Sequence, residues 1–125
     1  MNKLKMFLGL VLLLSPMLSA RAADLLIPTN SVWKYLDNGS DQGTAWRELG
    51  FNDSSWSSGR AELGYGDGDE ATTLSFGGSG SSSNNNKHIT YYFRHSFTVP
   101  NPSAYVLLRM LLKRDDGAVV YLNGT

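Results

Sequence analysis

Two turn signals near the end of the chain constrain its fold more than any other feature. Asp116-Gly117 separates an apolar run over 106–112 from a β-branched run over 118–122, and Asn123-Gly124 is the dipeptide typical of a two-residue hairpin turn. We therefore expect antiparallel strands on both sides of these turns. Because only Thr125 follows the second turn, we expect the sequence to be the front part of a larger domain whose closing strands come later.

Strand signals continue through the rest of the chain. Residues 32–36 alternate bulky side chains, and residues 25–27 before Pro28 predict a short edge strand. Alternation is clearest over 89–99, where we expect the odd-numbered residues to face inward. A further strand is predicted over 104–112, with one face formed by Val106, Leu108, Met110 and Leu112.

Two short turns interrupt the strands. Thr44 precedes a run of helix formers that Gly50 would end as C-cap, and Asp53 begins a second capped turn. Trp46 and Trp56 lie on these turns. We expect both indoles to be buried as plugs at one end of a β-sandwich, with ligand stacking as the alternative.

The N-terminus has the pattern of a secretory signal peptide. Lys3 and Lys5 precede an apolar run over 6–18 that is too short to span a bilayer. Ala20-Arg21-Ala22 then places small residues at the positions that a cleavage after Ala22 requires. We therefore expect residues 1–22 to be removed, and the protein to be secreted, periplasmic or at the cell surface, without a stable membrane anchor.

Charge and cysteine content narrow the possible functions. The chain has eleven basic and eleven acidic residues, and removal of Lys3, Lys5 and Arg21 would leave a net charge of −3. This balance counts against nucleic acid as a partner. Because the sequence has no cysteine, disulfides, thiolate-bound zinc and a thiol nucleophile are excluded. An exported chain without cysteine is more typical of bacteria than of eukaryotes.

The region over 57–87 is rich in Gly, Ser, Asn and Asp, and we expect loops with brief strands there. Asp67, Asp69 and Glu70 place three carboxylates beside flexible glycines, an arrangement that calcium could use through oxygen ligands. The alternative is a solvated acidic loop, and the spacing is not that of an EF-hand. Residues 77–87 form a low-complexity stretch that we expect to be a flexible insertion.

Residues typical of catalysis are few in the sequence after residue 22. His88 and His95 are seven positions apart, on opposite faces of an extended segment, so they do not easily bind one metal. Asp115 and Asp116 are neighbours in a tight turn, where carboxylates more often cap the backbone than exchange protons. We therefore expect this segment itself to be non-catalytic.

Several motifs, taken in order, resemble a known family. They are Trp33-Lys34-Tyr35, Gly43-Thr44-Ala45-Trp46, Phe51-Asn52-Asp53-Ser54-Ser55-Trp56, Gly64-Tyr65-Gly66-Asp67, Tyr91-Tyr92-Phe93-Arg94-His95-Ser96-Phe97-Thr98-Val99-Pro100 and Asp115-Asp116-Gly117-Ala118-Val119-Val120-Tyr121-Leu122-Asn123-Gly124. The ordered set resembles galactose-binding-like jelly-roll domains, especially the exported bacterial type that accompanies metallophosphoesterase, lamin-tail or spore-coat-kinase-like modules. It is more distantly similar to the sugar-binding domain of family 2 glycoside hydrolases.

The resemblance implies an all-β jelly-roll β-sandwich over 23–125 whose C-terminal strands are missing. It also implies an accessory domain that does no chemistry of its own. The sequence departs from the family pattern in the low-complexity insertion and in the absence of the last strands.

Three functions remain open from the sequence. The first is a non-catalytic accessory module of a larger exported protein, which binds carbohydrate or another polymer, or packs on a neighbouring catalytic domain. Trp33, Tyr35 and Tyr65 would then offer ring faces to sugar C–H surfaces. The second is the N-terminal part of an exported metallophosphoesterase or glycosidase whose active site lies beyond residue 125. The third is a structural or adhesive surface module without a small ligand.

Overall fold

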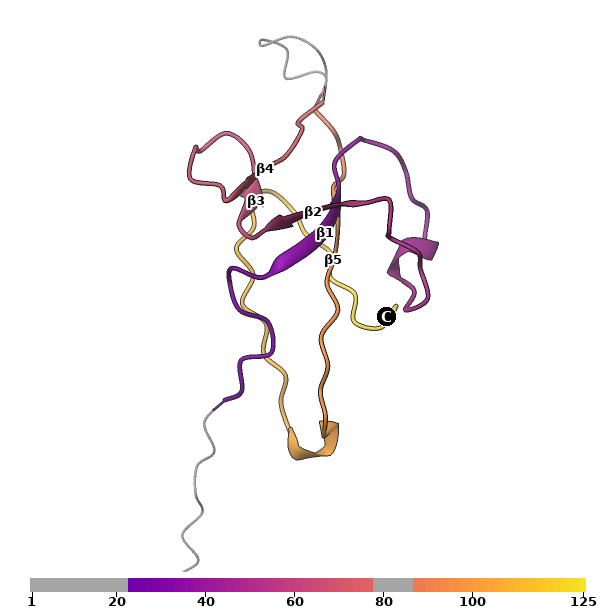
Figure 1. Ribbon diagram of the computed structural model, residues 1–125, viewed down its shortest axis with the longest axis vertical. Helices are drawn as coiled ribbons and strands as arrows, with labels where there is room; N and C mark the ends of the chain where they lie inside the picture. The colour runs from indigo at the N-terminus through magenta and orange to yellow at the C-terminus, as the bar shows by residue number, and fades with distance from the viewer. Residues whose placement is uncertain (1–22, 78–86) are drawn as a thin grey trace, which may run out of the picture.

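The computed structural model describes residues 23–77 and 87–125 (Figure 1). The predicted signal peptide and most of the predicted insertion therefore lie outside the described residues. Strands and irregular segments make up almost all of the described chain, together with two single turns of 3-10 helix, η1 (Ala45–Arg47) and η3 (Pro102–Ala104). This pattern agrees with the expected all-β class.

The main element is a three-stranded antiparallel sheet with β1 (Val32–Leu36) at its centre. β2 (Ser57–Arg60) and β5 (Tyr92–Arg94) pair with its two edges. A second, two-stranded parallel sheet joins β3 (Leu63–Gly64) to β4 (Thr72–Thr73). Thus β1 pairs both with the strand that follows it and with a strand from a distant part of the sequence.

The core lies on the face of the sheet that carries the even-numbered residues of β1 and β5. Trp56 and Tyr92 are buried there, with their ring centroids 6.2 Å apart. Phe51 packs edge-on against Trp56 at 5.6 Å, and Trp46 packs edge-on against Tyr92 at 5.1 Å. The connection between β1 and β2 therefore folds over this face and supplies most of its apolar cover. The prediction that Trp56 is buried is confirmed, and Trp46 is half-buried in the same cluster.

The strand predicted over 89–99 is shorter than expected, and its predicted odd-numbered inward face holds only in part. Phe97 and Val99 are less exposed than Ser96 and Thr98, but within β5 the most buried residue is even-numbered. Only residues 92–94 pair as β5, and Ile89 is fully exposed. The buried residue is Tyr92, at an even-numbered position. Tyr92 lies opposite Leu36 in the sheet, and Trp46 packs against its ring. The inward face of β5 is the even one because the apolar cover from the β1–β2 connection lies on that side.

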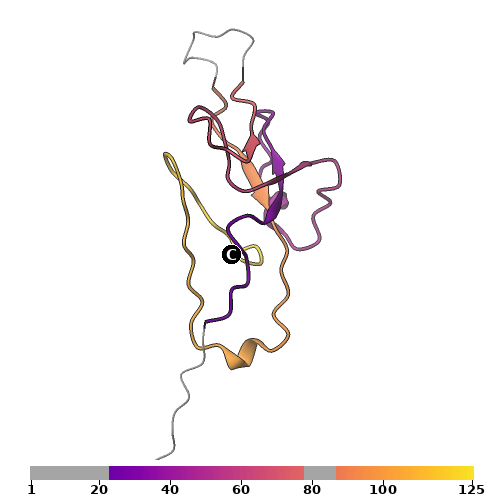
Figure 2. The same cartoon turned by 60° about the vertical axis from the view of Figure 1, so that its left-hand side comes forward.

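Three other predicted strands do not form. Residues 25–27, 104–112 and 118–122 join neither sheet, and η3 occupies the start of the second segment. Figure 2 shows the chain after η3, coloured light orange to yellow, running beside the sheet without joining it. An extended segment becomes a strand only where a neighbour completes its backbone hydrogen bonds. The apolar side chains of these last two segments are exposed, namely Val106, Leu107, Leu108, Met110, Leu111, Leu112, Val119, Val120 and Leu122.

The turn predicted at Asn123-Gly124 is confirmed. Leu122 and Thr125 exchange both backbone hydrogen bonds around it, at 2.9 and 3.2 Å. Asn123 and Gly124 both have positive φ, at 53° and 86°. These values are typical of the two-residue turn that joins antiparallel strands, since its backbone twist matches theirs.

The two predicted capped turns form with other caps. Thr44 makes no side-chain capping bond, and η1 ends at Arg47 with Glu48 as its C-cap, before Gly50. In the second turn the Trp56 amide donates to the Asp53 carbonyl, at 3.0 Å. The neighbouring Asn52 side chain supplies the cap there, accepting a bond from the Ser54 amide at 3.1 Å. The Asp53 carboxylate is thereby left available for another partner.

Gly59 in β2 is required by its surroundings. A methyl group at this position would meet the side chain of Thr72, closer than real Cβ atoms approach one another. Thr72 cannot easily move, because its hydroxyl donates to the Arg60 carbonyl at 2.8 Å. We expect Gly59→Ala to lower the free energy of unfolding by about 1–3 kcal/mol, as overpacking does. Urea unfolding measures this effect, and Gly50→Ala, which meets no atom, is the control. Equal stability of the two variants would contradict the prediction.

Candidate functional site

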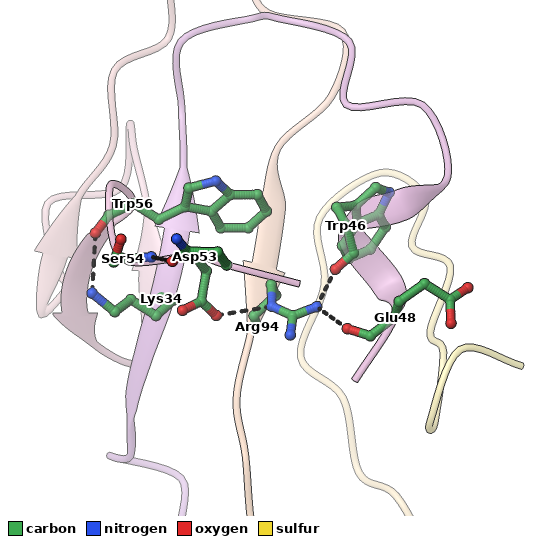
Figure 3. Close-up of polar contacts among 8 residues, drawn as sticks. Lys34, Trp46, Glu48, Asp53, Ser54, Trp56 and Arg94 are labelled. Carbon is green, nitrogen blue, oxygen red and sulfur yellow. Dashed lines mark hydrogen bonds and ion pairs between the residues drawn. The ribbon is translucent and has the colours of Figure 1, made fainter. Parts of the chain in front are cut away.

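The strongest polar network of the described residues centres on Arg94 in β5 (Figure 3). Its Nε donates to the Asp53 carboxylate at 2.9 Å. Its Nη1 donates to the carbonyl oxygens of Trp46 and Glu48, the latter at 3.2 Å. The guanidinium also lies 5.2 Å from the ring centre of Phe51. One side chain thus connects the sheet to both turns that cover it.

A small hollow of about 310 Å³ borders this network. Lys34 lies opposite Arg94 in the sheet, so the two cations share one face. Lys34 Nζ donates to the carbonyl of Trp56 at 3.2 Å (Figure 3). The residues around the hollow are Val32, Trp33, Lys34, Asp53, Ser58, Arg94, His95 and Ser96. Six of these eight residues are polar or charged, and both signs of charge are present.

A larger hollow of about 620 Å³ lies beside Tyr65. The ring of Phe76, which is 40% exposed, is 5.8 Å from that of Tyr65. Lys87 Nζ lies 5.6 Å from the Tyr65 ring centre. The full lining is Tyr65, Gly66, Thr73, Leu74, Ser75, Phe76, Gly77 and Lys87. Aromatic faces, hydroxyls and one ammonium thus surround an open space.

Tyr91 packs against Tyr65 but does not itself line the larger hollow. Its ring lies 5.8 Å from that of Tyr65, and His88 packs edge-on against it at 5.9 Å. The Tyr91 hydroxyl oxygen is buried, and among residues 23–77 and 87–125 it finds no hydrogen-bond partner of ordinary geometry. Burial, and then the nearby Tyr65 hydroxyl and the Asp37 carboxylate, raise the pKa of Tyr91 well above its usual value. Tyr91 therefore stays neutral and holds the Tyr65 ring by packing.

The three aromatic residues predicted to bind a ligand are not brought to one site. Tyr65 lines the larger hollow, and Trp33 borders the smaller one. Tyr35 is half-buried in β1 and lines neither. The Trp33 ring packs against His95 at 4.9 Å, and Nδ1 of that histidine lies 2.9 Å from the Val32 carbonyl. Ligand binding at these three residues stays a prediction.

The acidic loop has a defined internal structure. The Glu70 carboxylate accepts bonds from the amides of Asp67 and Gly68, at 2.9 and 3.0 Å. These bonds, led by the one from Asp67, lower the pKa of Glu70. Across residues 23–77 and 87–125, no three His, Asp or Glu side chains gather to hold a metal ion. Calcium bound by Asp67, Asp69 and Glu70 would need this loop to rearrange, and the site stays a prediction.

Asp115 and Asp116 serve the turn in which they lie. The Asp116 amide donates to the Asp115 carboxylate at 2.8 Å, and Asp116 adopts a positive φ of 61°. The Arg114 guanidinium contacts the Asp116 carbonyl. The prediction that a carboxylate here caps the turn is confirmed for Asp115, whereas Asp116 contributes its backbone to the turn.

Four residues that line the hollows were not predicted from the sequence, namely Lys34, Arg94, Phe76 and Lys87. Arg94 could have been found from the sequence, because it is a charged residue directly after the three aromatic residues 91–93. Its partner Asp53 was not, since Asp53 lies in the β1–β2 connection and meets Arg94 only when that connection folds over the sheet. No helix in the part of the chain that the structure describes is long and apolar enough to cross a membrane. No family model, curated protein or solved structure matches the chain.

Proposed function

We propose that the chain is an accessory module of a larger exported protein that binds a carbohydrate polymer through the larger hollow. The fold proposed for it is a jelly-roll β-sandwich of the galactose-binding-like type, on the strength of the ordered motifs in the sequence. The proposed role is non-catalytic. A hydrolase elsewhere in the same polypeptide would act on the polymer that this module holds.

The observation that carries the proposal is the pairing of Tyr65 with Phe76 beside the larger hollow. Sugar rings present flat C–H surfaces that aromatic faces contact, while their hydroxyls need polar partners. Thr73, Ser75 and Lys87 provide such partners around the same space. The volume is within the range of pockets that bury small molecules, so it suits one or two sugar units.

Retention on polysaccharides tests this function. The full chain is run by electrophoresis through gels that contain soluble polysaccharides of different composition. We expect one of them to slow the wild-type protein, and Tyr65→Ala to weaken binding about 10-fold, because the contact of one ring is worth on the order of 1.5 kcal/mol. Tyr105→Ala, a tyrosine outside both hollows, should be retained like the wild type. Equal retention of both variants would contradict the proposal.

A second candidate function is packing against a neighbouring domain of the same polypeptide. The observation that favours it is the row of exposed apolar side chains over 106–122, of which Val106 and Leu111 are almost fully exposed. Contiguous apolar surface on a soluble protein often marks an interaction site. The retention experiment separates the two functions, since a module that only packs on a neighbour would be slowed by no polysaccharide.

A further inference from the structure

The smaller hollow has the composition of a binding site that the proposed function does not use. Lys34 and Arg94 bring two positive charges to it, and Asp53 brings one negative charge. One positive charge is therefore in excess in a chain with no overall net charge. The hydroxyls of Ser58 and Ser96 can both donate and accept hydrogen bonds, and the rest of the lining is Val32, Trp33 and His95.

The Arg94 guanidinium is fixed in place before any ligand arrives. Arginine has five N–H donors, and the contacts to Asp53, Trp46 and Glu48 use only those of Nε and Nη1. Within the described residues, both N–H groups of Nη2 remain available. The side chain is only 15% exposed, so little freedom is left for it to lose on binding.

Lys34 is a second cation with N–H groups that are free to donate hydrogen bonds. Its ammonium gives one hydrogen bond to the Trp56 carbonyl, and in residues 23–77 and 87–125 it forms no ion pair with a carboxylate. Two of its three N–H groups are therefore free for a ligand. Because Lys34 and Arg94 are cross-strand partners, both cations are held by backbone pairing on one face.

We propose that this hollow binds the carboxylate of a hexuronate unit, so that the polymer recognised is an acidic polysaccharide. The carboxylate would accept bonds from Lys34 and Arg94, as oxyanions do from charged donors. The ring hydroxyls would bond to the serines and to the Asp53 oxygen that Arg94 does not use. The volume of about 310 Å³ lies at the small end of ligand pockets, which fits a single sugar unit.

The negative charge of Asp53 favours a sugar acid over a simple anion as the ligand of this hollow. Its carboxylate repels a small, highly charged anion such as phosphate, but it accepts hydrogen bonds from sugar hydroxyls. A ligand with one negative charge and several hydroxyls satisfies both features of the lining. The saccharide part of this inference rests on the proposed function, whereas the need for a negative charge does not.

Galacturonate and galactose provide a matched test, since they differ only in a carboxylate against a hydroxymethyl group. Each is titrated into the full chain, and binding is followed by calorimetry. We expect galacturonate to bind at least about 10-fold more tightly than galactose, because hydrogen bonds to charged groups are the stronger ones. Lys34→Gln should remove that preference, and Lys34→Arg should restore most of it. Rising salt should weaken galacturonate binding alone.

Control variants separate this site from the larger hollow. Lys87→Gln removes the same charge from the other hollow and should leave the preference for galacturonate unchanged. Tyr65→Ala should likewise spare it while reducing polysaccharide retention. Equal affinity for the two sugars, an unchanged preference in Lys34→Gln, or no saturable binding of galacturonate would overturn the proposal. Phosphate binding as tightly as galacturonate would overturn its saccharide part.

Discussion

Replacing Arg94 by methionine is expected to lower the free energy of unfolding by about 2–3 kcal/mol. The change leaves the Asp53 carboxylate, 29% exposed, without its partner, and it removes the donors to the carbonyl oxygens of Trp46 and Glu48. The contact with the Phe51 ring is lost as well. Methionine keeps most of the side-chain volume, so the loss reports on the polar contacts.

Urea unfolding followed by circular dichroism measures this effect. Arg114→Met is the matched control, because Arg114 is exposed and its hydrogen bond within the described residues goes to a carbonyl in its own turn. Its effect should stay within about 0.5 kcal/mol. Combining Arg94→Met with Asp53→Asn should cost less than the sum of the single changes, since both remove one ion pair. Strictly additive effects would show that the pair does not hold the turn on the sheet.

Replacing Trp56 by alanine is expected to lower the free energy of unfolding by about 3–5 kcal/mol. Trp56 is 5% exposed and packs against Phe51 and Tyr92. Its removal opens a cavity between the sheet and the connection that covers it. Because most domains are only marginally stable, such a loss can unfold the protein.

The control for this change is Leu111→Ala, at a leucine that is 92% exposed. It should alter the free energy of unfolding by at most about 0.5 kcal/mol. Thermal unfolding followed by circular dichroism compares the two variants, and Trp56→Phe should recover part of the stability because a ring is kept. A Trp56→Ala protein that melts like the wild type would place the core elsewhere.

The sequence predicted those features of the fold that depend on local chemistry. Asn123-Gly124 forms a turn with positive φ at both residues, and Asp115 bonds within its own turn. The face of β5 was not predictable in the same way. Tyr91, Tyr92 and Phe93 are all large aromatics, so alternation divides them into two faces without showing which one is covered. The cover comes from the β1–β2 connection.

Residues of the candidate sites were predicted only where the local sequence around a single residue was informative. Tyr65 stands among glycines and polar residues, so it was recognisable as a ring near the surface. Its partners Phe76 and Lys87 meet it only through folding, and nothing in their spacing indicates this. Lys34 and Arg94 become neighbours because β5 pairs with β1 in one particular register. Residues far apart in sequence converge through strand pairing, which local patterns do not encode.

The central position of β1 also sets an order of assembly. β2 pairs with β1 across one connection, whereas β5 is more than twice as far along the chain. Each doubling of a loop adds about 0.6 kcal/mol to the entropy cost of closing it, so the β1–β2 hairpin can form before β5 arrives. Arg94 is part of β5, so its contacts with the two turns that cover the sheet form only after β5 has paired with the β1–β2 hairpin. We therefore expect the contacts of Arg94 to slow the unfolding of the sheet more than they speed its folding.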